Sequence, residues 1–262
     1  MTQSLGERHQ LVRVNGTRHL VIQGECTTVM AQLAADERIR LDWSFTDLPY
    51  GTTYARWDSP IDLDAFWPSL LQMRRDAHVP MMFTAQQPFT SRLVMSRPEL
   101  FKVEWIWNKV HGTNFANANR QPLKVHEQVL VFYERQVDYS PIKTPGARNH
   151  TQGDYAADFG SESYLIRARG EDDLSGMKHP KTIVRIPKHS SSVGLHPNQK
   201  LVELVLYFLR TYASPGQLGL DATAGSGTTA VAAARYGCHS IAIEENPTHF
   251  DTTVRRLREL RV

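Results

Sequence analysis

A glycine-rich turn near the end of the chain constrains the fold more than any other feature. Residues 217–221 predict a short buried strand, residues 222–227 (Ala-Thr-Ala-Gly-Ser-Gly) a tight turn, and residues 228–236 a helix of small side chains. Residues 237–244 predict a second strand, which ends in an acid, Glu244, and residues 250–261 predict a terminal helix. This strand–helix–strand–helix unit is a building block of parallel sheets.

Only 37 of the 262 residues (262 − 225) follow Gly225, too few for the remaining strands of a doubly wound sheet. Those strands must therefore come from the N-terminal side. Apolar stretches there predict strands over residues 19–23, 39–46, 79–84, 100–107 and 128–133, and helices over 27–35 and 63–75. We expect an α/β, Rossmann-like fold that is circularly permuted, with a mostly parallel sheet and helices on both faces.

Residues 136–193 keep no lasting helical or strand period, apart from residues 182–186. An irregular stretch of this length inside a compact domain is typically functional or disordered. We expect a single domain over residues 1–262, with residues 136–193 as an irregular insert.

Composition excludes several classes of protein. The chain is 41% hydrophobic and 22% charged, as in globular proteins, and no segment approaches the roughly 20 apolar residues of a membrane span. The first residues lack the apolar core of a secretory signal, and the two cysteines form no CxxC pair. We expect a soluble, cytoplasmic protein without a metal. Its net charge of +3 is too small to identify a polyanionic partner.

The glycine turn has the spacing of a cofactor site. Gly225-x-Gly227-x-x-Ala230 lies between a predicted strand and helix, and Glu244 follows 19 residues after Gly225. Glycines let a ligand approach the backbone at a helix N-terminus, and an acid can bind a ribose diol. No lysine follows the glycines, which excludes a phosphate-binding P-loop. A nicotinamide or flavin dinucleotide and S-adenosylmethionine remain, besides glycines that serve only the turn.

Residues 46–51 (Thr-Asp-Leu-Pro-Tyr-Gly) end a predicted strand, where open α/β sheets place their ligands. The segment is either a simple turn or a site for an amino group. The Asp47 carboxylate and the Leu48 carbonyl could both accept from a planar amino group and favour its pyramidal form. Tyr50 would then offer an aromatic surface for the ring.

These motifs together resemble the amino-directed DNA methyltransferases. Residues 47–50 are similar to the family's Asp-Pro-Pro-Tyr motif, with Leu48 in place of the first proline, and residues 221–229 to its cofactor motif. Residues 243–244 resemble its ribose-binding acid, and residues 196–204 its His-Pro-Thr-Gln-Lys-Pro-Val-Glu stretch. Residues 85–90 and 122–133 resemble the phage-type adenine members. The catalytic motif precedes the cofactor motif, as in the permuted β group.

The resemblance implies an S-adenosylmethionine-dependent methyltransferase that acts directly on a flipped-out base. An aspartate at position 47, where cytosine-N4 enzymes usually have serine, implies adenine N6 as the acceptor. Cytosine N4 is the alternative, and a nicotinamide-dependent oxidoreductase is the alternative from another class. The implied catalytic residues are Asp47, Leu48, Pro49 and Tyr50. The implied cofactor-binding residues are Glu25, Asp47, Lys200, Asp221, Ala224, Gly225, Ser226, Gly227, Thr228, Glu244 and Asn246.

Two regions are candidates for contact with double-stranded DNA. Residues 105–126 contain Lys109, Arg120 and Lys124 and no acid, although a solvated loop over buried tryptophans would have the same composition. The insert adds Arg167, Arg169 and Arg185 and is the candidate target-recognition region. The resemblance also suggests a homodimer. It leaves open the recognition sequence and whether the enzyme is of the restriction–modification or the orphan phage type.

Overall fold

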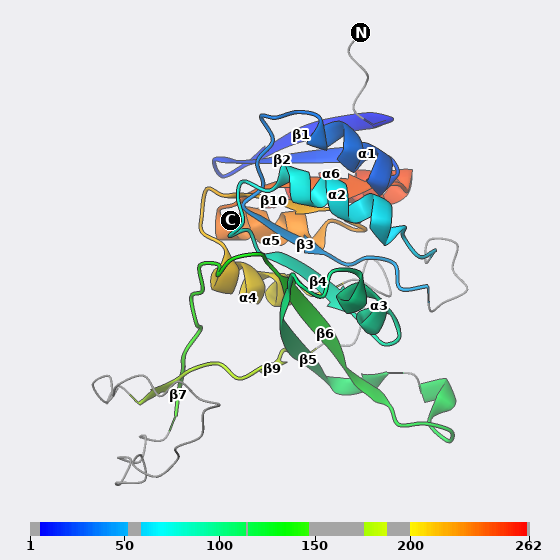
Figure 1. Cartoon of the computed structure of the whole chain (residues 1–262), viewed down its shortest axis with the longest axis vertical. Helices are drawn as coiled ribbons and strands as arrows, with labels where there is room; N and C mark the ends of the chain where they lie inside the picture. The colour runs from blue at the N-terminus through cyan, green and yellow to red at the C-terminus, as the bar shows by residue number, and fades with distance from the viewer. Residues whose placement is uncertain (1–5, 52–58, 114, 147–175, 188–199, 261–262) are drawn as a thin grey trace. The chain divides into compact units, whose positions relative to one another are not determined.

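The computed structural model describes residues 6–51, 59–113, 115–146, 176–187 and 200–260, and its centre is a nine-stranded sheet (Figure 1). The spatial order of the strands is β1 (Arg8–Val14), β2 (Thr17–Gln23), β11 (His239–Glu244), β10 (Leu218–Asp221), β3 (Trp43–Thr46), β4 (Met81–Ala85), β6 (Lys124–Phe132), β5 (Phe101–Thr113) and β9 (Ile183–Arg185). The strands from β2 to β4 in this order are parallel to one another. β1 and β6 are antiparallel to their neighbours, and β9 is parallel to β5.

Helices cover both faces of the sheet. α1 (Cys26–Ala34), α2 (Leu63–Met73) and α3 (Phe89–Ser96) bury apolar side chains with Phe83 and Leu130 of the strands. α4 (Val202–Tyr212), α5 (Thr228–Tyr236) and α6 (Pro247–Arg258) pack on the opposite face, against Phe45, Met82 and Val21 among others. The predicted α/β fold, with a mostly parallel sheet between two helical layers, is confirmed. No helix among these residues is long and apolar enough to cross a membrane.

The two strands nearest the C-terminus lie in the middle of the sheet. β10 and β11 separate β2 from β3, so the strand order is permuted as the sequence predicts. One residue shows why the sequence suits this pairing. Gly219 of β10 is paired with Trp43 of β3, and a Cβ at Gly219 would lie 2.1 Å from the Trp43 indole. Only glycine leaves room for that ring.

Some predicted boundaries are wrong for identifiable reasons. The strand predicted over residues 39–46 starts at Trp43, because Leu41 is hydrogen-bonded to the end of α2 instead of to β10 or β4 (Leu41 N to Met73 O, 2.8 Å). The terminal helix starts at Pro247, before the predicted residue 250. Asn246 caps it by accepting from the backbone N–H groups of the next turn, at 2.9 and 3.3 Å.

β5 and β6 continue beyond β4 as a hairpin, which we call the β5–β6 arm (residues 108–124). Figure 1 shows the arm extending from the sheet, with the 3-10 helix η2 (Phe115–Asn117) near its end. The strand register shifts between Asn108 and Thr113. Val110 there has a positive φ of 71°, and its N–H donates to Oδ1 of Asn108 (2.8 Å). A bulge therefore sits at the base of the arm.

The chain divides into two compact units. One contains Met1–Ser140 and Thr182–Val262, and the other Pro141–Lys181. The described residues of the second unit form a two-stranded ribbon, β7 (Thr144–Pro145) and β8 (Met177–Lys178). The predicted insert, residues 136–193, includes this unit. Its residues 147–175 and 188–193 lie outside the described residues, and its role in target recognition stays a prediction.

Candidate active site

The predicted catalytic corner lies at the carboxyl end of the parallel strands. Asp47 directly follows β3, and its backbone carbonyl accepts from the Thr223 hydroxyl of the turn after β10 (2.9 Å). Leu48 is buried, whereas Pro49 and Tyr50 are half-buried. The corner is thus tied to the neighbouring strand end, where open α/β sheets place their ligands.

The Asp47 carboxylate accepts its hydrogen bonds through one oxygen. Oδ1 accepts from the Tyr50 hydroxyl (2.7 Å), from the Thr84 hydroxyl of β4 and from Nζ of Lys200 (3.1 Å). The described residues provide no donor to Oδ2, and the side chain is 33% exposed. Asp47 is therefore held firmly by one oxygen and presents the other as an acceptor.

Tyr50 is fixed by its ring as well as by its hydroxyl. The ring stacks on Phe89 of α3, with centroids 5.4 Å apart and an angle of 26° between the planes. Burial, together with the charge of Asp47, raises the pKa of Tyr50 well above its ordinary value. The phenol therefore stays protonated and serves as a donor to Asp47.

Four charged side chains form an alternating row behind this corner. Lys200, which precedes α4, contacts Asp47 and also donates to Oε2 of Glu127 on β6 (2.7 Å). Glu127 Oε1 accepts from Lys109 of β5 (3.1 Å). The side chains of Lys109, Glu127 and Lys200 are 5%, 8% and 13% exposed. We call this set the charge row: Asp47, Lys200, Glu127 and Lys109.

The charge row corrects one prediction and adds residues that the sequence did not single out. Lys109 is not a DNA-contacting side chain, because it is buried and paired with Glu127. Lys200 is predicted as a cofactor residue, but its ammonium lies against Asp47 and Glu127. Glu127 and Thr84 come from separate strands. The sequence signal that could have indicated Glu127 is the alternation of side chains along β5 and β6. Glu127 is paired with Trp107 and lies on the same face of the sheet as that buried residue.

The glycine turn follows β10 and has two glycines in the left-handed region, Gly225 (φ 54°) and Gly227 (φ 78°). A Cβ at Gly227 would lie 2.5 Å from Cγ2 of Thr253, so α6 occupies that side of the turn. Among the described residues, a Cβ at Gly225 would have no atom within 4 Å. Gly225 thus leaves backbone open to a ligand, whereas Gly227 serves the packing of α6.

Glu244 is bound to the turn by backbone hydrogen bonds. Its Oε2 accepts from the N–H of Gly225 (2.7 Å) and its Oε1 from that of Asn246 (2.8 Å). Burial raises the pKa of Glu244, although both hydrogen bonds oppose the shift. The β10 and β11 ends thus bring the predicted acid, the glycines and Asn246 together.

The other predicted cofactor residues surround the same strand ends. Asp221 is buried, and burial raises its pKa to about 7. Ala224 donates its N–H to Ile243 O (2.8 Å), Ser226 accepts from Arg256, and the Thr228 hydroxyl donates to Lys200 O (3.3 Å). The last contact links the turn to the charge row.

Glu25 follows β2, next to the end of β11. It caps α1 by accepting from the backbone N–H groups of Thr27 and Thr28, each at 2.8 Å. Partial burial alone would raise its pKa, but these hydrogen bonds outweigh it and lower the pKa to about 2. The Gly24 N–H donates to Glu244 O (3.0 Å), so Glu25 and Glu244 lie at adjacent strand ends.

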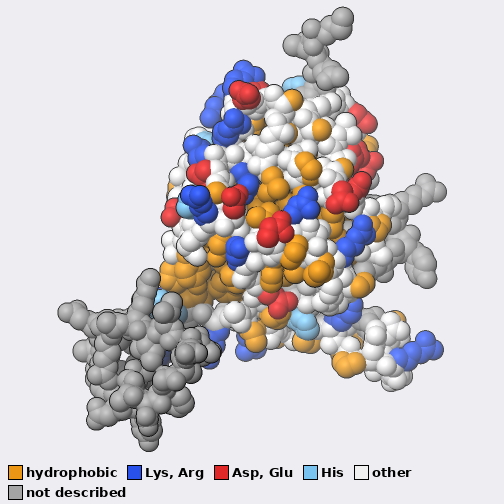
Figure 2. Space-filling view, in the orientation of Figure 1, with side chains coloured by type: hydrophobic (Ala, Val, Ile, Leu, Met, Phe, Trp, Pro, Cys, Tyr) orange, Lys and Arg blue, Asp and Glu red, His pale blue; other side chains and the backbone are white. Residues whose placement is uncertain are grey.

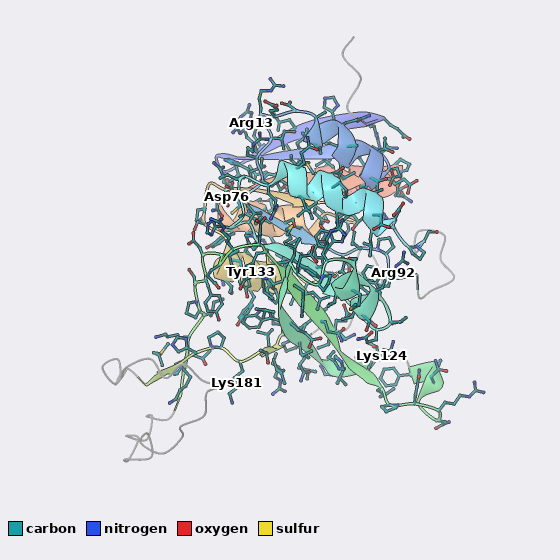
Figure 3. All side chains as sticks on the ribbon, viewed as in Figure 1. Arg13, Asp76, Arg92, Lys124, Tyr133 and Lys181 are labelled. Atoms are coloured by element: carbon teal, nitrogen blue, oxygen red, sulfur yellow. The ribbon has the colours of Figure 1, made fainter. Side chains whose placement is uncertain are left out.

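Three of the predicted DNA-contacting residues besides Lys109 are described, and all three are exposed. Arg120 and Lys124 are exposed on the β5–β6 arm, where Figure 3 labels Lys124 and Figure 2 shows basic side chains near the end of the arm. Arg185 is exposed on β9. Arg167 and Arg169 lie outside the described residues. The described residues contain no group of three or more potential metal ligands.

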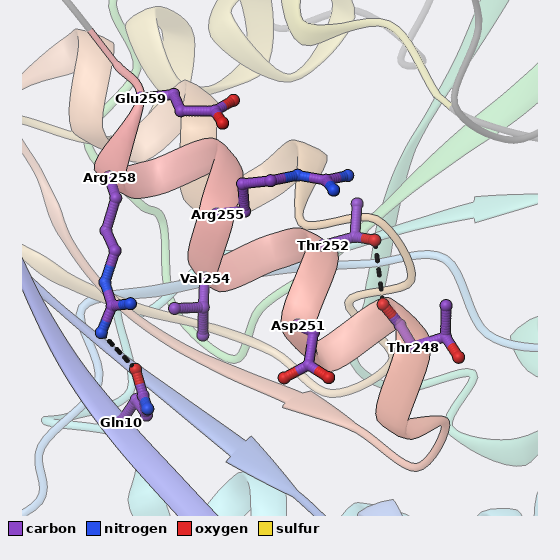
Figure 4. A pocket seen from close by; sticks show the side chains of 8 residues that line it. All are labelled: Gln10, Thr248, Asp251, Thr252, Val254, Arg255, Arg258 and Glu259. Atoms are coloured by element: carbon purple, nitrogen blue, oxygen red, sulfur yellow. Dashed lines mark hydrogen bonds between the residues drawn. The ribbon is translucent and has the colours of Figure 1, made fainter.

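A separate hollow of about 580 Å³ lies between α6 and β1 (Figure 4). Gln10, Asp251, Arg255 and Arg258 are among its lining residues. None of the predicted catalytic or cofactor residues lines it. The candidate site is therefore the edge formed by the ends of β2, β11, β10 and β3.

Comparisons with known proteins identify the family and the fold. A family model described as DNA methylase matches residues 41–255. The fold is similar to that of an M1.HpyAVI–SAM complex, with a TM-score of 0.60 and 18% identity over 90% of this chain and 98% of that one. It is also similar to PvuII DNA methyltransferase, which is cytosine-N4-specific, with a TM-score of 0.64 and 13% identity over 93% and 86%. No curated protein matches the sequence.

Proposed function

The chain belongs to the DNA methylase family and is a DNA methyltransferase of the N6/N4 type, and from this premise we propose that it methylates the N6 amino group of adenine. The methyl donor in this proposal is S-adenosylmethionine, and the substrate is double-stranded DNA. A nicotinamide-dependent oxidoreductase, the alternative from another class, does not fit this family.

One observation carries the proposal. Asp47 is anchored through Oδ1 by three donors, and its Oδ2 is left to accept at a half-exposed corner. An adenine amino group is a poor nucleophile because its lone pair is delocalised into the ring. Oδ2 and the Leu48 carbonyl would accept its two N–H bonds, which favours the pyramidal form with a directed lone pair.

The chain's residues favour the transition state over the ground state. When the nitrogen attacks, it gains positive charge, and the anchored Asp47 carboxylate stabilises that charge without having to reorient. A nitrogen–carbon bond would form as the sulfur–carbon bond of the donor breaks, and the nitrogen would then release a proton along its hydrogen bond to Asp47, which is exposed enough to pass it to water. S-adenosylmethionine, when bound, supplies the electrophilic methyl group and leaves as S-adenosylhomocysteine.

A base inside a duplex cannot reach this corner, so the target base must leave the helix at a cost of a few kcal/mol. Tyr50 would stack on the extruded base and offset about 1–3 kcal/mol of that cost. Its partner Phe89 would keep the ring in place.

The cofactor would lie along the strand ends from Glu25 to Asp47. The open backbone at Gly225 fits a ligand that approaches closely, and Glu244 beside it fits a ribose diol. Lys200, also a predicted cofactor residue, would contribute from its position between Asp47 and Glu127 in the charge row. The remaining predicted residues would support the turn: Asp221, Ala224, Ser226, Gly227, Thr228 and Asn246.

The β5–β6 arm supplies the proposed contacts to DNA. Arg120 and Lys124 are exposed there, and Arg185 is exposed on the neighbouring β9, so all three could reach phosphates. Sequence recognition is assigned to the insert, with Arg167 and Arg169. A homodimer and a cytoplasmic location stay predictions, and sedimentation analysis would test the first.

The experiment is methyl transfer from labelled S-adenosylmethionine to unmethylated genomic DNA, followed by digestion and identification of the labelled nucleoside. Label in N6-methyldeoxyadenosine supports the proposal. Label in N4-methyldeoxycytidine would show that the acceptor is cytosine and not adenine. The absence of label from DNA would refute the proposed reaction.

A further inference from the structure

Glu127 is buried next to the proposed catalytic carboxylate but does not reach the corner itself. Strand geometry explains its place. Residues of odd number on β3 and β6 face the same side of the sheet, as buried Phe45 and Val129 do. Asp47 and Glu127 continue these two rows toward the carboxyl end of β3, and Lys200 lies between their carboxylates.

The contacts form a single chain of alternating charge. Glu127 binds Lys109 through Oε1 (3.1 Å) and Lys200 through Oε2 (2.7 Å), and Lys200 reaches Oδ1 of Asp47 (3.1 Å). Two carboxylates and two ammonium groups leave the row with no net charge. A buried charge without a partner is strongly destabilising, so each member depends on the next.

We infer that Glu127 is a positioning residue, which holds the Lys200 ammonium on Oδ1 of Asp47 so that Oδ2 faces the amino group of the target base. This inference rests on the proposed function. Without Glu127, Asp47 would be the one carboxylate partner of Lys200 among the described residues. The ammonium then moves toward both carboxylate oxygens and competes with the base for Oδ2.

The electrostatics of the row agree with this role. Burial alone would raise the pKa of Glu127, but the two lysines outweigh it and lower the pKa below its ordinary value. Burial alone would lower the pKa of Lys200, but the carboxylates of Asp47 and Glu127 outweigh it and raise the pKa well above its ordinary value. Glu127 is thus one of the two carboxylates that favour the charged form of Lys200.

The test compares Glu127→Gln with Glu104→Gln, which removes an exposed carboxylate from the adjacent strand β5. We expect kcat of Glu127→Gln to fall about 10- to 100-fold, the size of effect that a misplacement of 1 Å produces, with an unchanged KM for S-adenosylmethionine. Glu104→Gln should match wild type. Equal kcat for the two variants would overturn the inference.

The pH profile separates positioning from a structural role. Loss of Glu127 removes one of the carboxylates that raise the pKa of Lys200, so an alkaline limb of kcat that reports Lys200 should move to lower pH. A lower yield of folded enzyme would scale the profile without moving it. The titratable groups that face Lys200 or adjoin its partners are Asp47 and Tyr50 after β3, Lys109 on β5, Glu127 on β6 and Asp221 on β10.

A double variant covers the case in which Glu127→Gln fails to fold. Lys109→Met/Glu127→Gln removes one charge of each sign and keeps the side-chain volumes similar, a change that buried ion pairs often tolerate. It should lose as much kcat as the single variant, and wild-type kcat would overturn the inference.

One measurement does not depend on activity. The Lys200 side-chain nitrogen can be titrated by NMR, with Lys200→Arg for assignment. An unchanged pKa in Glu127→Gln would overturn the inference even if the wild-type enzyme methylated nothing, an outcome that would refute the proposed function separately.

Discussion

The two glycines of the turn differ in a way that can be measured. In Gly227→Ala the new Cβ meets Thr253 Cγ2 at 2.5 Å and Oγ1 at 2.7 Å, at a φ of 78°. The left-handed backbone costs about 1–2 kcal/mol and the overpacking about 1–3 kcal/mol. Displacement of Thr253 also weakens its hydrogen bond to Gly225 O (3.2 Å), worth about 0.5–1.5 kcal/mol. The free energy of unfolding should fall by about 3–5 kcal/mol.

Gly225→Ala is the matched control in the same turn. Its φ of 54° carries the same backbone cost, but its Cβ enters open space, so the loss of stability should be about 1–2 kcal/mol. The methyl group would occupy the space proposed for the cofactor. We therefore expect S-adenosylmethionine affinity to fall at least about tenfold, equivalent to about 1.4 kcal/mol.

Urea unfolding measures the stabilities, and calorimetric titration measures the affinity. Thr253→Ala in the Gly227→Ala background removes the two closest atoms and should recover about 1–3 kcal/mol. Equal destabilisation by the two alanines, or no recovery in the double variant, would refute the packing argument. Wild-type affinity in Gly225→Ala would show that no ligand lies against this backbone.

Three further predictions concern the acceptor, the DNA and the pH. Asp47→Ala should lower methyl transfer by about 10²–10³-fold and leave the affinity for S-adenosylmethionine within about threefold. Asp64→Ala, which removes an exposed carboxylate, is the control. Loss of affinity in Asp47→Ala would show that Asp47 acts on the cofactor and not on the acceptor. Arg120→Ala/Lys124→Ala should flatten the dependence of log K for DNA on log salt by about 0.9 per lost phosphate contact, and an unchanged slope would remove the arm from the interface. Burial raises the folded pKa of Asp221 from 3.8 to about 7, so its stabilising contribution is complete below about pH 4 and is lost as the pH rises to 7. Asn cannot ionise, so the free energy of unfolding of Asp221→Asn, taken relative to wild type by urea unfolding, should be up to about 4 kcal/mol more favourable at pH 8 than at pH 4. The same difference from wild type at both pH values would contradict the raised pKa.

The permuted order was predictable because the strand patterns of residues 19–133 come before the glycine turn in the sequence. The β10 and β11 patterns are strong, since both are short, apolar and bounded by turn residues. The β1 strand was missed because most of its residues, including Leu11 at 53%, are exposed at the sheet edge. α3 was missed because it begins at Phe89 without a side-chain cap.

The site could be predicted only in part. Asp47, the glycines and Glu244 belong to local motifs, and their spacing carries the signal. The charge row belongs to no local motif, because its members come from strands and loops up to 153 residues apart (200 − 47). The register of the sheet brings them together. Lys109 was assigned to DNA because a basic composition does not reveal which face of a strand a lysine occupies.

The position of β10 and β11 bears on how the molecule is made. During synthesis β2 and β3 leave the ribosome before the strands that belong between them, and β10 starts 172 residues after the end of β3 (218 − 46). Until β10 and β11 are made, β2 and β3 each have one unpaired edge, to which a strand from elsewhere can bind wrongly. The cofactor turn is made together with those last strands. The strands that fill the middle of the sheet therefore also bring the glycine turn and Glu244, the residues of the proposed cofactor site.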